Sequence, residues 1–158
     1  MGYNYSHLDK KSFSWFREDD TKATLKSIEL REGKIRGLNP FEIEFSYPIS
    51  VIGGLNCSGK STILALSACA YHNKRSGIKL ASRKENYYTF SDFFVQSAEE
   101  IPPEGINIIY GILHNHWRPS ENVPEGKGLG YQWRIKRTGG RWNDYSKRVE
   151  RNVVYLCT

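Results

Sequence analysis

The sequence has no run of about 18 consecutive apolar residues, the length that a membrane-spanning helix needs. Its N-terminal residues, Met1–His7, also lack the apolar core of a secretory signal. Cysteine is scarce, and the sequence contains only Cys57, Cys69 and Cys157. Their odd number does not suggest a set of disulfides, and their spacing is not that of metal ligands. We therefore expect a cytoplasmic protein with reduced thiols and no membrane partner.

Length and composition indicate one globular domain. The 158 residues are enough for a domain with its own core, and 39% hydrophobic and 13% aromatic content are typical of a folded chain. The net charge of +6 permits contact with nucleic acid. A nucleotide-binding face alone would leave a similar excess of Lys and Arg, so the charge does not decide between these two classes of ligand.

One stretch carries a recognisable chemistry. Residues 54–61 read G-L-N-C-S-G-K-S and fill every fixed position of the phosphate-binding pattern G-x-x-x-x-G-K-[ST]. Gly54 and Gly59 permit the backbone conformations and close approaches of such a loop, whose N–H groups then form a nest for phosphate. Lys60 supplies a positive charge for the outer phosphates, and the Ser61 hydroxyl is a ligand for Mg²⁺.

The flanking residues fit the strand–loop–helix context of this pattern. Ile49, Val51 and Ile52 predict a short buried strand before the loop, and residues 62–71 predict a helix after it. The N-terminus of that helix would add a favourable dipole at the phosphates. We therefore expect an α/β fold of the P-loop NTPase type that binds ATP and Mg²⁺.

The remaining pattern predicts an antiparallel β subdomain around this unit. Residues 1–22 form a polar N-terminal arm with aromatics, and the ATPase-like part spans residues 23–158. Ser91 or Asp92 is expected to cap a short helix, and residues 119–130 to form a long hairpin loop. Strands are expected at residues 25–30, 41–45, 106–113, 131–136 and 152–157.

A basic cluster lies in residues 134–151, with interleaved aromatic residues such as Trp133. Its cations could contact phosphates while the aromatic rings stack on bases. The alternative is an exposed hairpin face that contacts a partner subunit. The residues assigned to this nucleic-acid or partner contact are Arg134, Lys136, Arg137, Arg141, Lys147 and Arg148.

The element order over residues 25–158 resembles the N-terminal part of an ABC-type ATPase head, in the group of the RecF, SMC and overcoming-lysogenization-defect families. The residues that carry the resemblance are Gly54, Asn56, Gly59, Lys60, Ser61 and Thr62, followed by Ile63 and Leu64. The aromatic segment 87–96 and the basic segment 140–155 are similar to the ATPases of bacterial anti-phage systems, of the Septu type or linked to retrons.

The resemblance implies a role for several residues. The loop residues Cys57 and Ser58, with Thr62, would hold the inner phosphates through the loop amides. Arg36, on the turn between the first two strands, would contact the nucleotide. Gln96 would join Ser61 at Mg²⁺ and at the attacking water. Family members use ATP to close two heads, so the implied partners are a second head and a nuclease or other effector, acting in defence or DNA maintenance.

Two parts of such a machine are missing from the sequence. Hydrolysis needs an acidic pair at the end of a buried strand, and no stretch of about four apolar residues precedes Asp or Glu here. No L-S-G-G-like signature is present either. We therefore expect no catalytic residue in this chain and interpret it as a fragment of an ATPase. The alternative is a non-hydrolysing module that binds nucleotide, or nucleic acid through residues 134–151.

Overall fold

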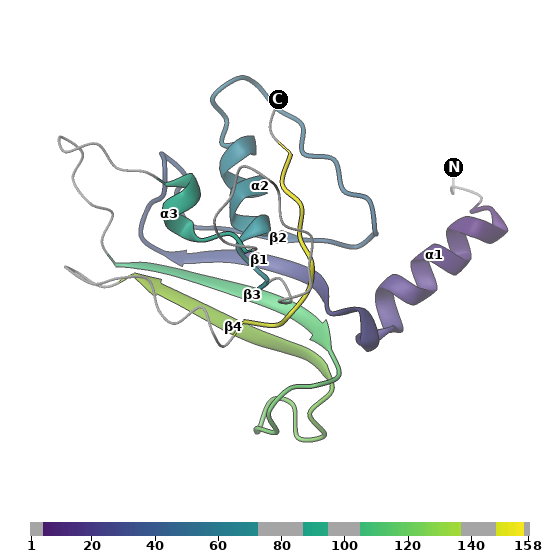
Figure 1. The fold of residues 1–158 in the computed structure, drawn as a ribbon. Coiled ribbons are helices and arrows are strands. Elements are labelled where there is room, and N and C mark those ends of the chain that lie inside the picture. Colours follow the sequence, from purple (N-terminus) through teal and green to yellow (C-terminus); the bar gives the residue numbers. More distant parts are fainter. Residues whose placement is uncertain (1–4, 73–86, 95–104, 137–147, 157–158) are drawn as a thin grey trace.

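A computed structural model describes residues 5–72, 87–94, 105–136 and 148–156. They build one four-stranded antiparallel sheet with the strand order β2-β1-β3-β4 (Figure 1). The strands are β1 (Thr24–Glu32), β2 (Phe41–Glu44), β3 (Ile106–His114) and β4 (Gly128–Lys136). The predictions of strands at 25–30, 41–45, 106–113 and 131–136 are confirmed. Strand β4 begins at Gly128, inside the stretch expected to be a loop.

One face of the sheet forms the core. The register pairs Ile28 with Tyr110 and Leu30 with Ile108, and all four side chains are at most 1% exposed. The Tyr110 hydroxyl donates a hydrogen bond of 2.9 Å to the Leu66 carbonyl. This contact joins the middle of the sheet to the helix that follows the phosphate loop.

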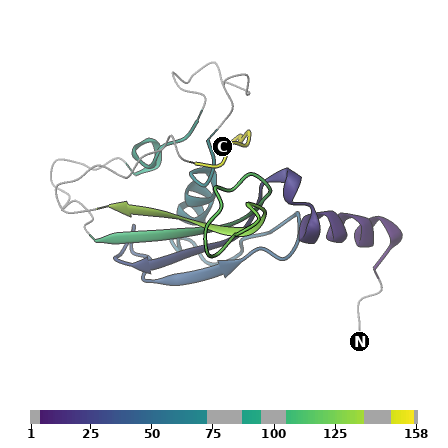
Figure 2. The ribbon, with the colours of Figure 1, turned by 90° about the horizontal axis from the view of Figure 1, so that it is seen from below.

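Three α-helices accompany the sheet in the part of the chain that the structure describes. They are α1 (His7–Glu18), α2 (Lys60–Ala68) and α3 (Phe90–Phe93), with a 3-10 turn at Asp20–Lys22. In Figure 1, α2 and α3 lie on one side of the sheet, together with the C-terminal stretch that ends at residue 156. Figure 2 views the same sheet from below, with its strands side by side and α1 leading away from one end.

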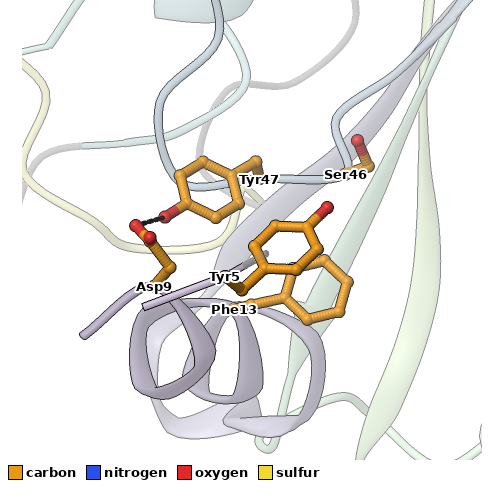
Figure 3. Close-up of a pocket in the computed structure, with 5 residues that line it drawn as sticks. All are labelled: Tyr5, Asp9, Phe13, Ser46 and Tyr47. Carbon is orange, nitrogen blue, oxygen red and sulfur yellow. Dashed lines mark hydrogen bonds between the residues drawn. The ribbon is translucent and has the colours of Figure 1, made fainter. Parts of the chain in front are cut away.

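Helix α1 is part of the N-terminal arm and begins with a capping box, in which Ser6 and Asp9 exchange hydrogen bonds. Its rings contact the segment after β2: Phe13 stacks between Tyr5 and Tyr47, with 6.4 Å between neighbouring ring centroids (Figure 3). The Tyr47 hydroxyl also donates to Asp9 at 3.3 Å. These contacts attach the outer end of α1 to the rest of the molecule.

Helix α3 begins two or three residues earlier than an N-cap at Ser91 or Asp92 would place it. Thr89 is the N-cap, and its backbone N–H and hydroxyl both donate to the Asp92 carboxylate. Asp92 therefore contributes as the third residue of a capping box. The expectation that Ser91 or Asp92 caps this helix is wrong for that reason.

Two predicted strands do not form. Residues 49–52 make no ladder, and Ile49 and Val51 are 76% and 91% exposed. Residues 152–156 also run without a ladder, and Leu156 is 81% exposed. A strand needs a hydrogen-bonded neighbour, and among the described residues neither segment has one beside it. Cys157, the last residue of the second prediction, lies outside the described residues.

Candidate phosphate-binding site

The candidate phosphate-binding loop, residues 54–59, is a turn directly before α2. Three of its residues have positive φ angles: Gly54 at 149°, Cys57 at 64° and Gly59 at 91°. The Ser58 N–H donates to the Leu55 carbonyl at 3.3 Å and closes the tip. Residues 54–58 are all exposed to solvent.

Gly59 is required by its surroundings. A Cβ atom added there would lie 2.4 Å from Leu38 Cδ2, and the φ angle of 91° disfavours any side chain. Leu38 belongs to the turn between β1 and β2, where Ile35 and Leu38 exchange two backbone hydrogen bonds. The first strand pair therefore packs directly against the end of the loop. The sequence gives no signal for this contact, because Leu38 is part of an ordinary Gly-containing turn.

The Lys60 side chain folds back across the loop. Its ammonium donates to the carbonyls of Gly54, at 3.0 Å, and Leu55, at 2.5 Å. An ammonium group carries three donors, so this geometry holds a positive charge over the loop and leaves it within reach of an incoming anion. The expected contact of Lys60 with the outer phosphates stays a prediction, because here the ammonium binds loop carbonyls.

The N-terminus of α2 is open to an anion. Its N-cap, Gly59, has no side chain, no side-chain cap hydrogen bond is present, and the first turn contains no acidic residue. The first amides of a helix have no intrahelical acceptor, and the helix dipole adds partial positive charge there. Ser61 is exposed at this end, whereas Thr62 is 8% exposed. Ser61 is therefore the first-turn side chain open to a metal or a phosphate.

Two further residues were expected at the nucleotide, and the structure describes one of them. Arg36 is on the turn between β1 and β2, as expected, with φ at 46° and its guanidinium 5.5 Å from the Phe94 ring centroid. The turn also carries Leu38, so Arg36 is two residues from the contact with Gly59. Gln96, the second expected metal ligand, lies outside the described residues.

No metal centre made of protein acids is evident in the part of the chain that the structure describes. No group of three or more His, Cys, Asp or Glu side chains converges there. For Mg²⁺, the described residues offer the exposed Ser61 hydroxyl beside the candidate phosphate-binding loop. In this arrangement most of the oxygen ligands of the ion would come from the bound phosphates and from water.

The prediction that residues 134–151 form an exposed basic contact surface needs correction. Arg134 and Arg148 are each 3% exposed, so neither side chain is available for contact with nucleic acid or a partner subunit. Arg134 donates to Gln132 Oε1 and lies 5.9 Å from the Tyr110 ring centroid. Of the other expected contact residues, Lys136 is half-buried, and Arg137, Arg141 and Lys147 lie outside the described residues.

Arg148 has a structural function. One of its terminal nitrogens donates to the carbonyls of Cys69 at 2.8 Å, Tyr71 at 3.0 Å and Tyr88 at 2.9 Å. Cys69 and Tyr71 follow α2, and Tyr88 precedes α3. Arg148 therefore joins the C-terminal stretch to the segments that follow α2 and precede α3, and its charge strengthens these hydrogen bonds.

Comparisons with known proteins give no further guide to this site, because no protein-family model, no curated protein and no solved structure matches the chain. In the described part of the chain, no helix is long and apolar enough to cross a membrane.

Proposed function

We propose that the chain binds ATP with Mg²⁺ through residues 54–62, as the nucleotide-binding part of an ABC-type ATPase of the RecF, SMC and OLD group. One observation carries the proposal. A complete G-x-x-x-x-G-K-S sequence forms an exposed turn at an uncapped helix N-terminus, with the Lys60 ammonium held across it. This combination of amides, dipole and cation is what a triphosphate requires.

In the proposed complex, the loop amides and the first amides of α2 hold the inner phosphates. Lys60 exchanges its two carbonyl acceptors for the outer phosphate oxygens, and Ser61 completes the coordination of Mg²⁺. Arg36, close to the loop through Leu38, contacts the nucleotide from the side. Gln96 is proposed to complete the metal site.

The wider role that we propose is a switch that depends on nucleotide. Bound ATP closes this unit on a second head in a cytoplasmic assembly, and closure controls a nuclease or another effector in anti-phage defence or DNA maintenance. The support is the resemblance in residues 54–64. The catalytic carboxylates for hydrolysis are not encoded in residues 1–158, so turnover requires groups from outside this sequence.

The alternative is a nucleic-acid-binding module based on residues 134–151. It loses support from the structure, because Arg134 and Arg148 are buried. A nucleotide-binding module that does not hydrolyse ATP remains compatible with the same loop geometry. Both candidates predict binding without turnover by this chain, so they differ in whether a buried strand that ends in paired carboxylates follows Thr158 in a longer protein.

The test is calorimetric titration of the chain with ATP and Mg²⁺, beside Lys60→Ala and the exposed-lysine control Lys22→Ala. We expect binding by the parent chain and by Lys22→Ala, and at least a tenfold weaker affinity for Lys60→Ala, since a charge-assisted contact contributes about 1.5–3 kcal/mol. Equal affinities for all three proteins would overturn the proposal.

Cysteine labelling gives an independent readout. Cys57 is exposed at the tip of the loop, whereas Cys69 is buried. ATP with Mg²⁺ is expected to slow iodoacetamide modification of Cys57, because bound phosphates cover the turn. A labelling rate that does not change at saturating ATP would mean that the nucleotide binds elsewhere or not at all.

A further inference from the structure

The face of the sheet that turns away from α2 and α3 carries an exposed apolar edge. Side chains alternate along β4, so Leu129, Tyr131 and Trp133 share this face, and they are 43%, 45% and 40% exposed. The Tyr131 and Trp133 ring centroids are 6.5 Å apart. Two large aromatic rings of this exposure on one strand are a common mark of a contact surface.

Strand register connects each aromatic residue to a carboxylate at the opposite edge of the sheet. Trp133 pairs with Ile109, Ile109 with Glu29, and Glu29 with Glu42. Residues that pair directly share a face, so these four form one row across the sheet. The row begins with an exposed ring on β4 and ends with an exposed carboxylate on β2.

A second row repeats the arrangement. Tyr131 pairs with Gly111, Gly111 with Ser27, and Ser27 with Glu44. A Cβ atom at Gly111 would lie 3.4 Å from the Tyr131 ring and 2.4 Å from Ser27 Oγ. The Tyr131 ring therefore lies close to the backbone of Gly111. The middle of this row has no large side chain, because it contains only Gly111 and Ser27.

The charge on this face is opposite to that of the whole chain, which is +6. Arg31 pairs with Glu29 at 2.8 Å, and Glu42 and Glu44 at the edge of the sheet are exposed. Directly opposed carboxylates such as Glu29 and Glu42 repel each other. Arg31 offsets part of this repulsion through its charge interactions with Glu29 and Glu42, and the two rows still hold three carboxylates, Glu29, Glu42 and Glu44, beside this one guanidinium.

Acidic residues also flank the far end of the apolar edge. Leu113 and Leu129 line a cavity of about 390 Å³ together with Glu18 and Asp20. Carboxylates from α1 and the following turn therefore border the same apolar strip. The pattern of apolar surface beside excess negative charge thus occurs at two places along this face.

We propose that this face, from Trp133 and Tyr131 on β4 to Glu42 and Glu44 on β2, binds a segment of a partner protein that has basic side chains next to apolar ones. Charge complementarity favours such a segment over nucleic acid, whose phosphates would meet the glutamates. The site is separate from the phosphate loop and does not depend on ATP.

The spacing defines the segment. Three strand separations of about 4.8 Å place the glutamates about 14 Å from the aromatic residues. In an extended peptide, side chains on the same side repeat every 6.6–6.8 Å or so, so residues four positions apart span this distance. A basic residue and an apolar residue with that separation would reach both ends of a row.

The probe is the synthetic peptide KTKTKTFTFTFT, titrated into the full chain without nucleotide and followed by calorimetry. Two matched peptides, ETETETFTFTFT and KTKTKTSTSTST, remove the positive charge and the apolar side chains respectively. We expect the first peptide to bind about tenfold more tightly than either control peptide, because it alone satisfies both ends of a row. Equal binding of the three, or no binding by any, would overturn the proposal.

Variants then locate the surface. The double variant Glu42→Gln and Glu44→Gln is expected to weaken binding of KTKTKTFTFTFT about fivefold at low salt, in line with the strength of exposed ion pairs. Trp133→Ser is expected to weaken it about tenfold. Glu150→Gln and Leu156→Ser change an exposed acid and an exposed apolar side chain of the C-terminal stretch and are expected to have no effect.

Three outcomes would contradict the assignment. If the glutamate double variant binds the peptide as tightly as the parent chain, charge does not contribute to binding. Both glutamates are exposed, so their replacement by glutamine is not expected to affect folding. Tighter binding of a twelve-nucleotide thymidine oligomer, lost in Trp133→Ser, would make the face a nucleic-acid platform. Self-association of the parent chain in sedimentation, abolished by Trp133→Ser, would make it an interface between copies of this chain.

Discussion

Strand β3 and residues 49–52 are both short runs rich in β-branched apolar residues, yet they are in opposite environments. Ile106, Ile108 and Ile112 on β3 are completely buried, whereas Ile49 and Val51 are 76% and 91% exposed. Strand β3 has a hydrogen-bonded neighbour on each side, and residues 49–52 have none among the described residues. Strand pairing, and not composition, decides which run is buried.

The same contrast separates the scaffold from the candidate site. The sheet forms its core from its own strands and from α2, so it holds the turn between β1 and β2 firmly against Gly59. The phosphate loop lies outside that core and is exposed over residues 54–58. We infer that stability depends on the sheet and ligand binding on the loop, and that changes in one affect the other only through Leu38 and α2.

The contrast between β3 and residues 49–52 is tested by truncating one side chain in each. This test has the largest expected effect. Ile112→Ala should lower the free energy of unfolding by about 2–5 kcal/mol, because it removes completely buried methyl groups and leaves a cavity. Val51→Ala should change it by no more than about 0.5 kcal/mol, since that side chain is exposed. Urea unfolding of both variants measures the difference. Similar losses would mean that residues 49–52 are buried in solution.

Arg148 tests whether the C-terminal stretch belongs to the scaffold. Arg148→Met should destabilise the chain by about 3 kcal/mol, since three carbonyls lose a shared donor in a buried place. Arg118→Met removes an exposed guanidinium and is the matched control. A thermal shift that is the same for both variants would contradict the structural role of Arg148.

The contact between scaffold and loop is tested at two glycines. Gly59→Ala combines a φ angle of 91° with a clash against Leu38, so we expect a loss of about 1–3 kcal/mol and weaker ATP binding. Gly53→Ala meets no atom within 4 Å and has no positive φ angle, so it should be nearly neutral. Equal stability of the two variants in urea would show that Leu38 does not pack against the loop.

A smaller effect concerns pH and is confined to the end of β3. Burial lowers the pKa of His114 below its ordinary value of 6.5, with a further contribution from His116. Below pH 6.5 the unfolded chain therefore binds more protons than the folded one at this residue, and stability falls as the pH falls from 6.5 through the folded pKa. His114→Gln should flatten this part of the stability curve, whereas His116→Gln should not remove it. An unchanged slope in His114→Gln would contradict the assignment.

Local patterns predicted the elements whose neighbours are also in this sequence. The alternation in residues 41–45 and the apolar run in residues 106–113 identified β2 and β3, because these strands pair within the described sheet. The glycine and lysine pattern predicted a turn and a helix after it, and both form, although that helix begins at Lys60 and not at Thr62. Such features depend on backbone conformation over a few residues.

Features that depend on distant contacts were not predictable. Arg134 and Arg148 belong to a segment whose composition is that of a solvated basic face. Only the fold shows that their side chains are buried against carbonyls and aromatic rings. The contact of Leu38 with Gly59 joins segments that no short pattern connects. Likewise, residues 49–52 have a strand composition, but pairing decides the outcome.

The central claim is that residues 54–62 form a phosphate site supported by an independent sheet, and amide NMR tests it most directly. Addition of ATP with Mg²⁺ to the ¹⁵N-labelled chain should shift the amide signals of residues 54–62 and of Arg36, and should leave those of β3 and β4 unchanged. Lys60→Ala should keep the spectrum of the sheet and lose the ATP-dependent shifts. Shifts centred on another part of the molecule, or none at saturating ATP, would contradict the account.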